Sequence, residues 1–98
     1  MNKAEVLKTL KKNVEILKKY HVKKIGLFGS VLKGNNTSES DIDLIVEFNE
    51  GKKNYNNFID LVSFLEELFQ KRVELLTIEA LSPYMKPKIL EEAYFESF

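Results

Sequence analysis

The sequence contains no cysteine, which excludes a disulfide framework and a thiolate metal site. It also lacks a long hydrophobic run, because charged residues interrupt every apolar stretch before it could cross a bilayer. The N-terminus, from Met1 to Glu5, has no apolar stretch of the kind found in signal peptides. These absences predict a cytoplasmic protein without a membrane-spanning segment.

The chain has no excess of charge of either sign, since 15 basic side chains balance 15 acidic ones. Residues 1–24 hold eight lysines against two glutamates, whereas residues 25–98 hold seven basic and 13 acidic side chains. The basic segment could contact an anionic partner, but the lysine-rich face of a solvated helix is the simpler interpretation. Domains dedicated to nucleic acid are normally basic throughout, so the composition argues against a nucleic-acid partner.

The length of 98 residues suffices for one hydrophobic core, so we expect a single domain over residues 1–98. Asn2 and Glu5 have the spacing of a capping box. One amphipathic helix should follow, with apolar residues at helical spacing: Val6, Leu10, Val14 and Leu17. A second apolar stripe over residues 58–69 predicts another helix, and Ser82-Pro83 is typical of the start of a last one.

Three strands are expected, at residues 24–28, 41–48 and 72–77, and the tail 94–98 could form a short edge strand. Residues 31–40 should hold a turn or short helix and then a loop. This connection is too short for a helical crossover, so the first two strands should pair antiparallel. The strands on either side of the 58–69 helix should run parallel with a right-handed crossover. The result is an α+β fold of α/β type, with helices against a mixed sheet of three to four strands.

Two acidic residues, Asp41 and Asp43, stand two apart on a predicted strand and therefore project from one face, about 6–7 Å apart at the backbone. Like charges this close raise each other's pKa, and a cation between them would remove that cost. Mg²⁺ takes such carboxylates together with substrate phosphates. Upstream, Gly29 lets backbone amides approach an anion, and Ser30 adds a hydroxyl donor. If the two strands are neighbours, a phosphate-binding turn stands beside a metal site, as phosphoryl-type transfer requires.

These residues resemble the signature of the DNA polymerase beta-like nucleotidyltransferase superfamily: Phe28-Gly29-Ser30, ten residues, then Asp41-Ile42-Asp43-Leu44. The whole length resembles the smallest branch of that superfamily, the minimal nucleotidyltransferases often encoded beside a HEPN-domain protein. The resemblance implies transfer of a nucleoside monophosphate, most simply AMP from ATP, with two Mg²⁺ ions. It also implies a protein acceptor, a HEPN-type toxin modified on a hydroxyl side chain, with this chain as its antitoxin.

The resemblance assigns catalysis and metal binding to three carboxylates: Asp41, Asp43 and Glu74. It assigns nucleotide binding to Gly29, Ser30 and Lys33. Two of these positions depart from the family pattern, because Glu74 stands where aspartate is more usual and Lys33 replaces an arginine. The longer Glu74 could displace a metal ligand by about one bond length.

Plainer alternatives exist for several of these residues. Asp41 could cap a turn, Ser30 could serve only the turn, and Glu74 could be a solvated strand residue. Asp43 is harder to explain this way, because its strand is otherwise rich in isoleucine and valine. His21, the only histidine, is expected near the end of the first helix, without a catalytic role. A rival function is a binding module that neutralises the partner by covering it.

Overall fold

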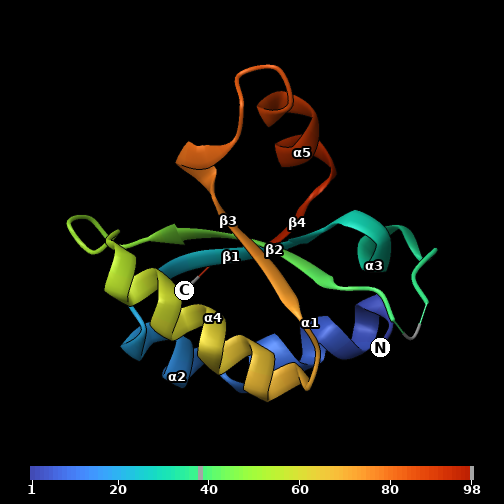
Figure 1. The fold of residues 1–98 in the computed structure, drawn as a ribbon, viewed down its shortest axis with the longest axis horizontal. Helices are drawn as coiled ribbons and strands as arrows, with labels where there is room; N and C mark the ends of the chain where they lie inside the picture. The colour runs from blue at the N-terminus through green and yellow to red at the C-terminus, as the bar shows by residue number, and fades with distance from the viewer. Residues whose placement is uncertain (38, 98) are drawn as a thin grey trace.

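A four-stranded mixed sheet forms the centre of the computed structural model, which describes residues 1–37 and 39–97 (Figure 1). The strands lie in the order β3 (Val73–Thr77), β2 (Ile42–Phe48), β1 (Val22–Phe28) and β4 (Tyr94–Ser97). β1 pairs antiparallel with β2 and with β4, whereas β2 pairs parallel with β3. The predicted mixed sheet, both predicted pairings and the edge strand are therefore confirmed, although Phe98 lies outside the described residues.

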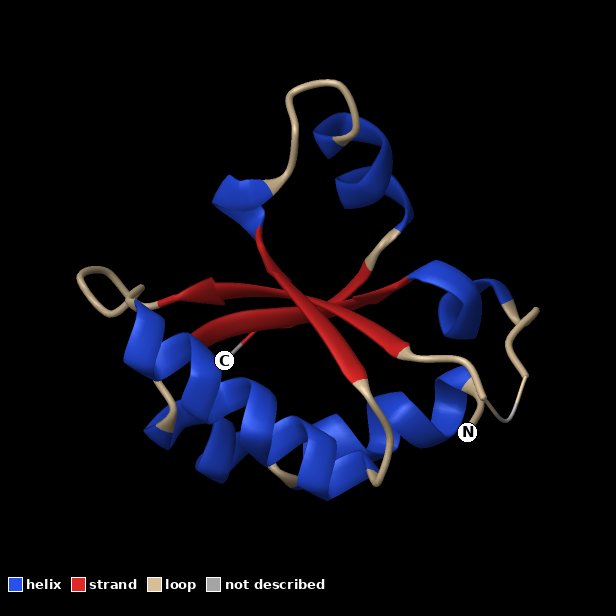
Figure 2. Ribbon diagram, viewed as in Figure 1, coloured by secondary structure: helices blue, strands red, loops and turns tan. Residues whose placement is uncertain are grey.

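Helices cover the two faces of this sheet unequally (Figure 2). Three lie together on one face: α1 (Lys3–Lys12), α2 (Val14–Lys19) and α4 (Tyr55–Phe69). The other side carries the 3₁₀ turn η1 (Ile78–Ala80) and α5 (Lys86–Glu92), which form an arch between β3 and β4, while the short α3 (Gly29–Lys33) follows β1. α3 is the short helix expected after the first strand, and Ser38 in the loop behind it lies outside the described residues. Over residues 1–37 and 39–97, no helix has the length and apolarity that a bilayer crossing requires.

The core lies between the sheet and α1, α2 and α4, as the alternating pattern of β2 dictates. Ile42, Leu44 and Val46 have no exposed surface, and Leu61 and Leu65 of α4 join them in the same cluster. Ile45 was expected on the polar face with Asp43 and Glu47, yet it is also fully buried. Buried Leu81, in the arch between β3 and β4, shows that this second face is partly covered as well. Only one end of that second face therefore remains open for polar side chains.

The N-terminal helix is interrupted, and the prediction of one continuous helix is wrong. α1 begins at the predicted capping box of Asn2 and Glu5. It ends at Lys12 and is capped by Asn13, whose side chain donates from Nδ2 to the carbonyl of Thr9 at 2.8 Å, and α2 starts at Val14. An asparagine that bonds back to the preceding turn competes with helix geometry, which apolar spacing alone does not reveal.

β4 is fixed against β1 by a close contact between an aromatic ring and a glycine. Phe95 is the register partner of Gly26, and a Cβ atom at position 26 would come within 2.7 Å of the Phe95 ring. The ammonium of Lys24 lies 4.8 Å from the centre of the same ring. This contact fixes the C-terminal end of α5, and with it one wall of the candidate site.

Candidate active site

The predicted third carboxylate lies beside Asp43. Glu74 is the register partner of Asp43 in the parallel pair of β2 and β3. Both face away from the core, because Val73 and Leu75 are buried on the opposite side of β3. The two carboxyl groups lie within hydrogen-bonding reach of each other when one of them is protonated, and this interaction raises the pKa of Asp43. The structure thus brings Asp43 and Glu74 together as the sequence predicted.

The surroundings of Asp43 oppose its ionisation. Burial raises the pKa of this carboxyl most, the hydrogen bond and charge of Glu74 raise it further, and the charge of Asp41 adds a smaller increment. The backbone N–H of Ser30 donates to the carboxylate and acts in the opposite direction. The net pKa of Asp43 is about 6, against a usual value of 3.8. A positive charge at this position would relieve the repulsion.

The Gly29-Ser30 turn is built around the same aspartate. Phe28 is the register partner of Asp43 across β1 and β2, so the chain turns directly over the carboxylate. Gly29 has a φ of 74°, which few residues with a side chain adopt. A Cβ atom at position 29 would also collide with the Asp43 carboxylate, standing 2.8 Å from its Cγ. Two independent constraints therefore require glycine here.

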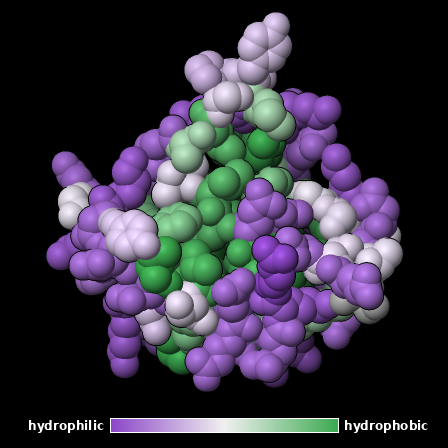
Figure 3. All heavy atoms as spheres, in the orientation of Figure 1, coloured by the Kyte–Doolittle hydropathy of each residue, from purple (hydrophilic) through white to green (hydrophobic). Residues whose placement is uncertain are grey.

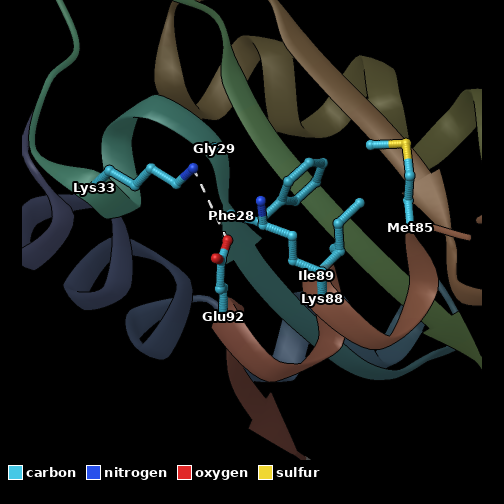
Figure 4. Close-up of a pocket in the computed structure, with 7 residues that line it drawn as sticks. All are labelled: Phe28, Gly29, Lys33, Met85, Lys88, Ile89 and Glu92. Carbon is cyan, nitrogen blue, oxygen red and sulfur yellow. Dashed lines mark ion pairs between the residues drawn. The ribbon is translucent and has the colours of Figure 1, made fainter.

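A cavity of about 220 Å³ opens beside this turn (Figure 4). It is lined by residues of β1, α3 and the arch: Phe28, Gly29, Lys33, Met85, Lys88, Ile89 and Glu92. The ammonium of Lys33 lies 3.9 Å from the carboxylate of Glu92, and this ion pair joins α3 to α5 at one side of the cavity. Lys33 is thus placed at the cavity, but its charge is shared with Glu92.

Four of the six predicted site residues lie together, and the other two stand at the edges of the site. Gly29, Ser30, Asp43 and Glu74 lie together, whereas Asp41 stands just before β2, half-buried and close enough to affect the charge of Asp43. Within the described part of the chain, no three acidic or histidine side chains are arranged around one ion position. Asp43 and Glu74 nevertheless form a donor pair of the oxygen type that Mg²⁺ prefers, and substrate phosphates commonly complete such a site.

Other residues line the cavity that no sequence pattern had indicated. Met85, Ile89 and Glu92 line the cavity from the arch, yet apolar residues four apart indicate helix packing rather than a ligand site. The burial of Ile45 was not predictable either, because the alternation of apolar and polar residues along β2 does not reveal that the second face of the sheet is covered. His21 lies before β1, at the far end of that strand from Gly29, with a φ of 68°.

The fold and this site define a nucleotidyltransferase domain, and the family model of that description matches residues 7–95. The chain belongs to this family. MJ1379 of Methanocaldococcus jannaschii, named as a candidate protein adenylyltransferase, is 39% identical over 95 residues, which cover 94% of this chain and 95% of the relative. The protein adenylyltransferase MntA of Thermococcus cleftensis is 32% identical over 81 residues, which cover 83% of this chain and 81% of that protein.

Solved structures share the fold. A chain described as a candidate minimal nucleotidyltransferase superposes with a TM-score of 0.82 at 26% identity, covering 96% of this chain and 95% of its own. A chain of a toxin–antitoxin structure with AMP-PNP superposes with a TM-score of 0.67 at 21% identity, covering 97% of this chain and 72% of its own. The resemblance inferred from the signature residues is confirmed.

Proposed function

We propose that this chain is a protein adenylyltransferase that moves AMP from ATP onto a hydroxyl side chain of a HEPN-type toxin and so acts as its antitoxin. The observation that carries the proposal is the Asp43–Glu74 carboxylate pair directly beside the Gly29-Ser30 turn. Relatives at 32–39% identity bear the name protein adenylyltransferase, which supports AMP as the transferred group. A chain of a toxin–antitoxin structure named MntA–HepT shares the fold, which supports a toxin as the acceptor.

The reaction exchanges one oxygen–phosphorus bond for another. The acceptor hydroxyl oxygen forms a bond to the α-phosphorus of ATP, the bond from that phosphorus to the bridging oxygen of the β-phosphate breaks, and pyrophosphate leaves with the electron pair. The hydroxyl proton is released. Catalysis then consists mainly of positioning and of stabilising negative charge.

The residues divide these tasks. Ser30 offers its hydroxyl to the triphosphate, while its backbone N–H holds Asp43 in place. Asp41, Asp43 and Glu74 would hold the two Mg²⁺ ions, whose positive charge stabilises the entering and leaving oxygens. Glu74 is the more exposed member of the carboxylate pair. We assign Glu74 to the ion that would activate the acceptor hydroxyl.

The cavity accommodates only part of a nucleotide. Its volume of about 220 Å³ is below the roughly 300–1,000 Å³ of pockets that enclose a whole ligand. Phe28, Met85 and Ile89 provide apolar surface for the adenosine moiety, and Lys88 adds positive charge nearby. Lys33 can reach a phosphate only by leaving Glu92.

The rival function is neutralisation by binding alone, and Glu74→Gln separates the two. The variant keeps the shape of the site but removes a charge that matters for transfer, so transfer of label from ATP to the product of the adjacent gene should fall by roughly 100-fold or more. ATP binding should persist, because the turn and the other carboxylates remain. Labelled CTP, GTP and UTP, tested in parallel, establish the nucleobase preference.

Glu79→Gln provides the control, because Glu79 is an exposed glutamate of η1 paired with Lys53 rather than with the site. Loss of both transfer and toxin neutralisation in Glu74→Gln alone supports the enzyme. Neutralisation that survives the loss of transfer, at equal protein concentration, establishes the binding module instead.

A further inference from the structure

Two large side chains stand exposed next to each other at the outer end of the arch between β3 and β4. Tyr84 exposes 97% of its surface and Met85 exposes 58%. Figure 1 shows this connection as the part of the chain furthest from the helix-covered face, and in Figure 3 the side chains there project beyond the surrounding surface. A tyrosine this exposed contributes little to the stability of the fold, because it buries almost no apolar area.

The turn that carries this pair is nevertheless ordered. The two prolines of the chain, Pro83 and Pro87, stand on either side of Tyr84-Met85 and restrict the backbone. The carbonyl of Ser82 accepts from the N–H of Met85 at 3.1 Å and from that of Lys86 at 2.9 Å. The hydroxyl of Ser82 also accepts from the N–H of Met85, at 3.2 Å. A preorganised turn reduces the entropy lost when its side chains bind a partner.

The position of the turn points to a particular occupant. Met85 lines the cavity beside Gly29, so Tyr84 stands one residue beyond the rim. Because Met85 and Gly29 line the same cavity, a protein whose hydroxyl enters that cavity from the arch contacts this turn. Residues 81–90 hold two lysines, Lys86 and Lys88, and no acid. A surface complementary to this turn would be an apolar recess with acidic side chains at its edge.

We propose that the Tyr84-Met85 turn is the docking element for the acceptor protein. The Tyr84 ring fills an apolar recess of the acceptor, Met85 packs against the edge of that recess, and Lys86 contacts its acidic side chains. Tyrosine is enriched among the residues that dominate binding energy, and methionine adapts to irregular surfaces. The inference rests on the proposed function, because the acceptor is the protein adenylylated at the adjoining site.

Tyr84→Ala tests the proposal, and Tyr55→Ala is its matched control. Tyr55 is also an exposed tyrosine, 77% accessible, but it lies at the start of α4 and away from the cavity. With the product of the adjacent gene as acceptor, Tyr84→Ala should raise both its Kd and its KM by about 10- to 100-fold. The affinity for ATP, the melting temperature and kcat at saturating acceptor should stay close to wild type. Lys86→Glu should weaken binding most at low ionic strength.

The results distinguish this inference from the function on which it rests. Equal Kd and KM in Tyr84→Ala and wild type, with normal transfer, overturn the docking turn and leave the enzyme intact. A Kd that depends on Tyr84 in a chain that transfers no AMP supports docking and refutes the adenylyltransferase. If Tyr84→Ala changes only the oligomeric state of the chain alone, the turn binds a second copy and the proposal is wrong.

Discussion

Asp43→Asn should stabilise the protein in EDTA at neutral pH while it impairs metal binding. The carboxyl of Asp43 has a pKa of about 6, so at pH 7.5 it is ionised beside Glu74 and the two charges repel. Asparagine removes one charge and keeps both contacts, because its oxygen accepts from Ser30 and its amide donates to Glu74. The substitution therefore isolates the charge from the shape of the site.

The expected gain follows from the pKa. The difference between 3.8 and about 6 corresponds to about 3 kcal/mol between the two protonation states. Because the carboxyl is only partly buried, solvent screening reduces this to about 1 kcal/mol. For a domain of this size, that gain raises the melting temperature by about 4–8 °C.

The pH dependence has a definite sign. The pKa of Asp43 is raised in the folded chain, so between pH 3.8 and about 6 the folded state binds more protons than the unfolded state. Wild type loses stability relative to Asp43→Asn as the pH rises through this window. Below pH 3.8 the carboxyl is protonated in both states, and the advantage of the variant should disappear.

Thermal unfolding in EDTA at pH 3.5, 5 and 7.5 measures this difference, with Asp60→Asn at an exposed position of α4 as the control. Added Mg²⁺ or Mn²⁺ should stabilise wild type more than Asp43→Asn, since the variant has lost a charged ligand. A variant that is no more stable than wild type at pH 7.5 in EDTA would refute the repulsion. Wild-type metal affinity in the variant, measured by calorimetry, would refute Asp43 as a ligand.

Two further substitutions test the nucleotide side of the site. Ser30→Ala should weaken ATP binding by about 1.5–3 kcal/mol, one hydrogen bond to a charged group, with little change in melting temperature; the reverse pattern would make Ser30 structural. Glu92→Gln should tighten ATP binding by roughly two- to fivefold by freeing Lys33, while stability changes little because the pair is exposed. Lys33→Met, added to Glu92→Gln, should abolish that gain in ATP affinity. A gain that persists in the double variant would exclude Lys33 as a phosphate contact.

The sequence predicted those parts of the site that depend on strand alternation. Val73 and Leu75 needed a buried face, so Glu74 had to point the other way, towards the face already assigned to Asp43. The end of the first strand at Gly29 was also predictable, because glycine before serine at a strand end indicates a turn. These inferences require only local periodicity and the order of the strands.

The remaining features depend on contacts between segments far apart in sequence. Lys33 and Glu92 are 59 residues apart, and nothing in either local pattern predicts their ion pair. The break at Asn13 depends on a side-chain bond to Thr9 that competes with a helix favoured by every apolar position around it. The cavity wall from Met85 to Ile89 requires the arch to return over the sheet, which β4 achieves through its contact with Gly26.

The bond from Ser30 to Asp43 links the two halves of the site. The same turn that presents the Ser30 hydroxyl to a triphosphate uses its backbone N–H to hold a carboxylate. A cation at Asp43 favours the ionised carboxylate, which is the stronger acceptor for that N–H and so stiffens the turn. A triphosphate bound at this turn would also supply further oxygen ligands to the cation. Binding of metal and nucleotide should therefore be cooperative, and the cooperativity should be weaker in Asp43→Asn, where the acceptor oxygen remains but its charge does not.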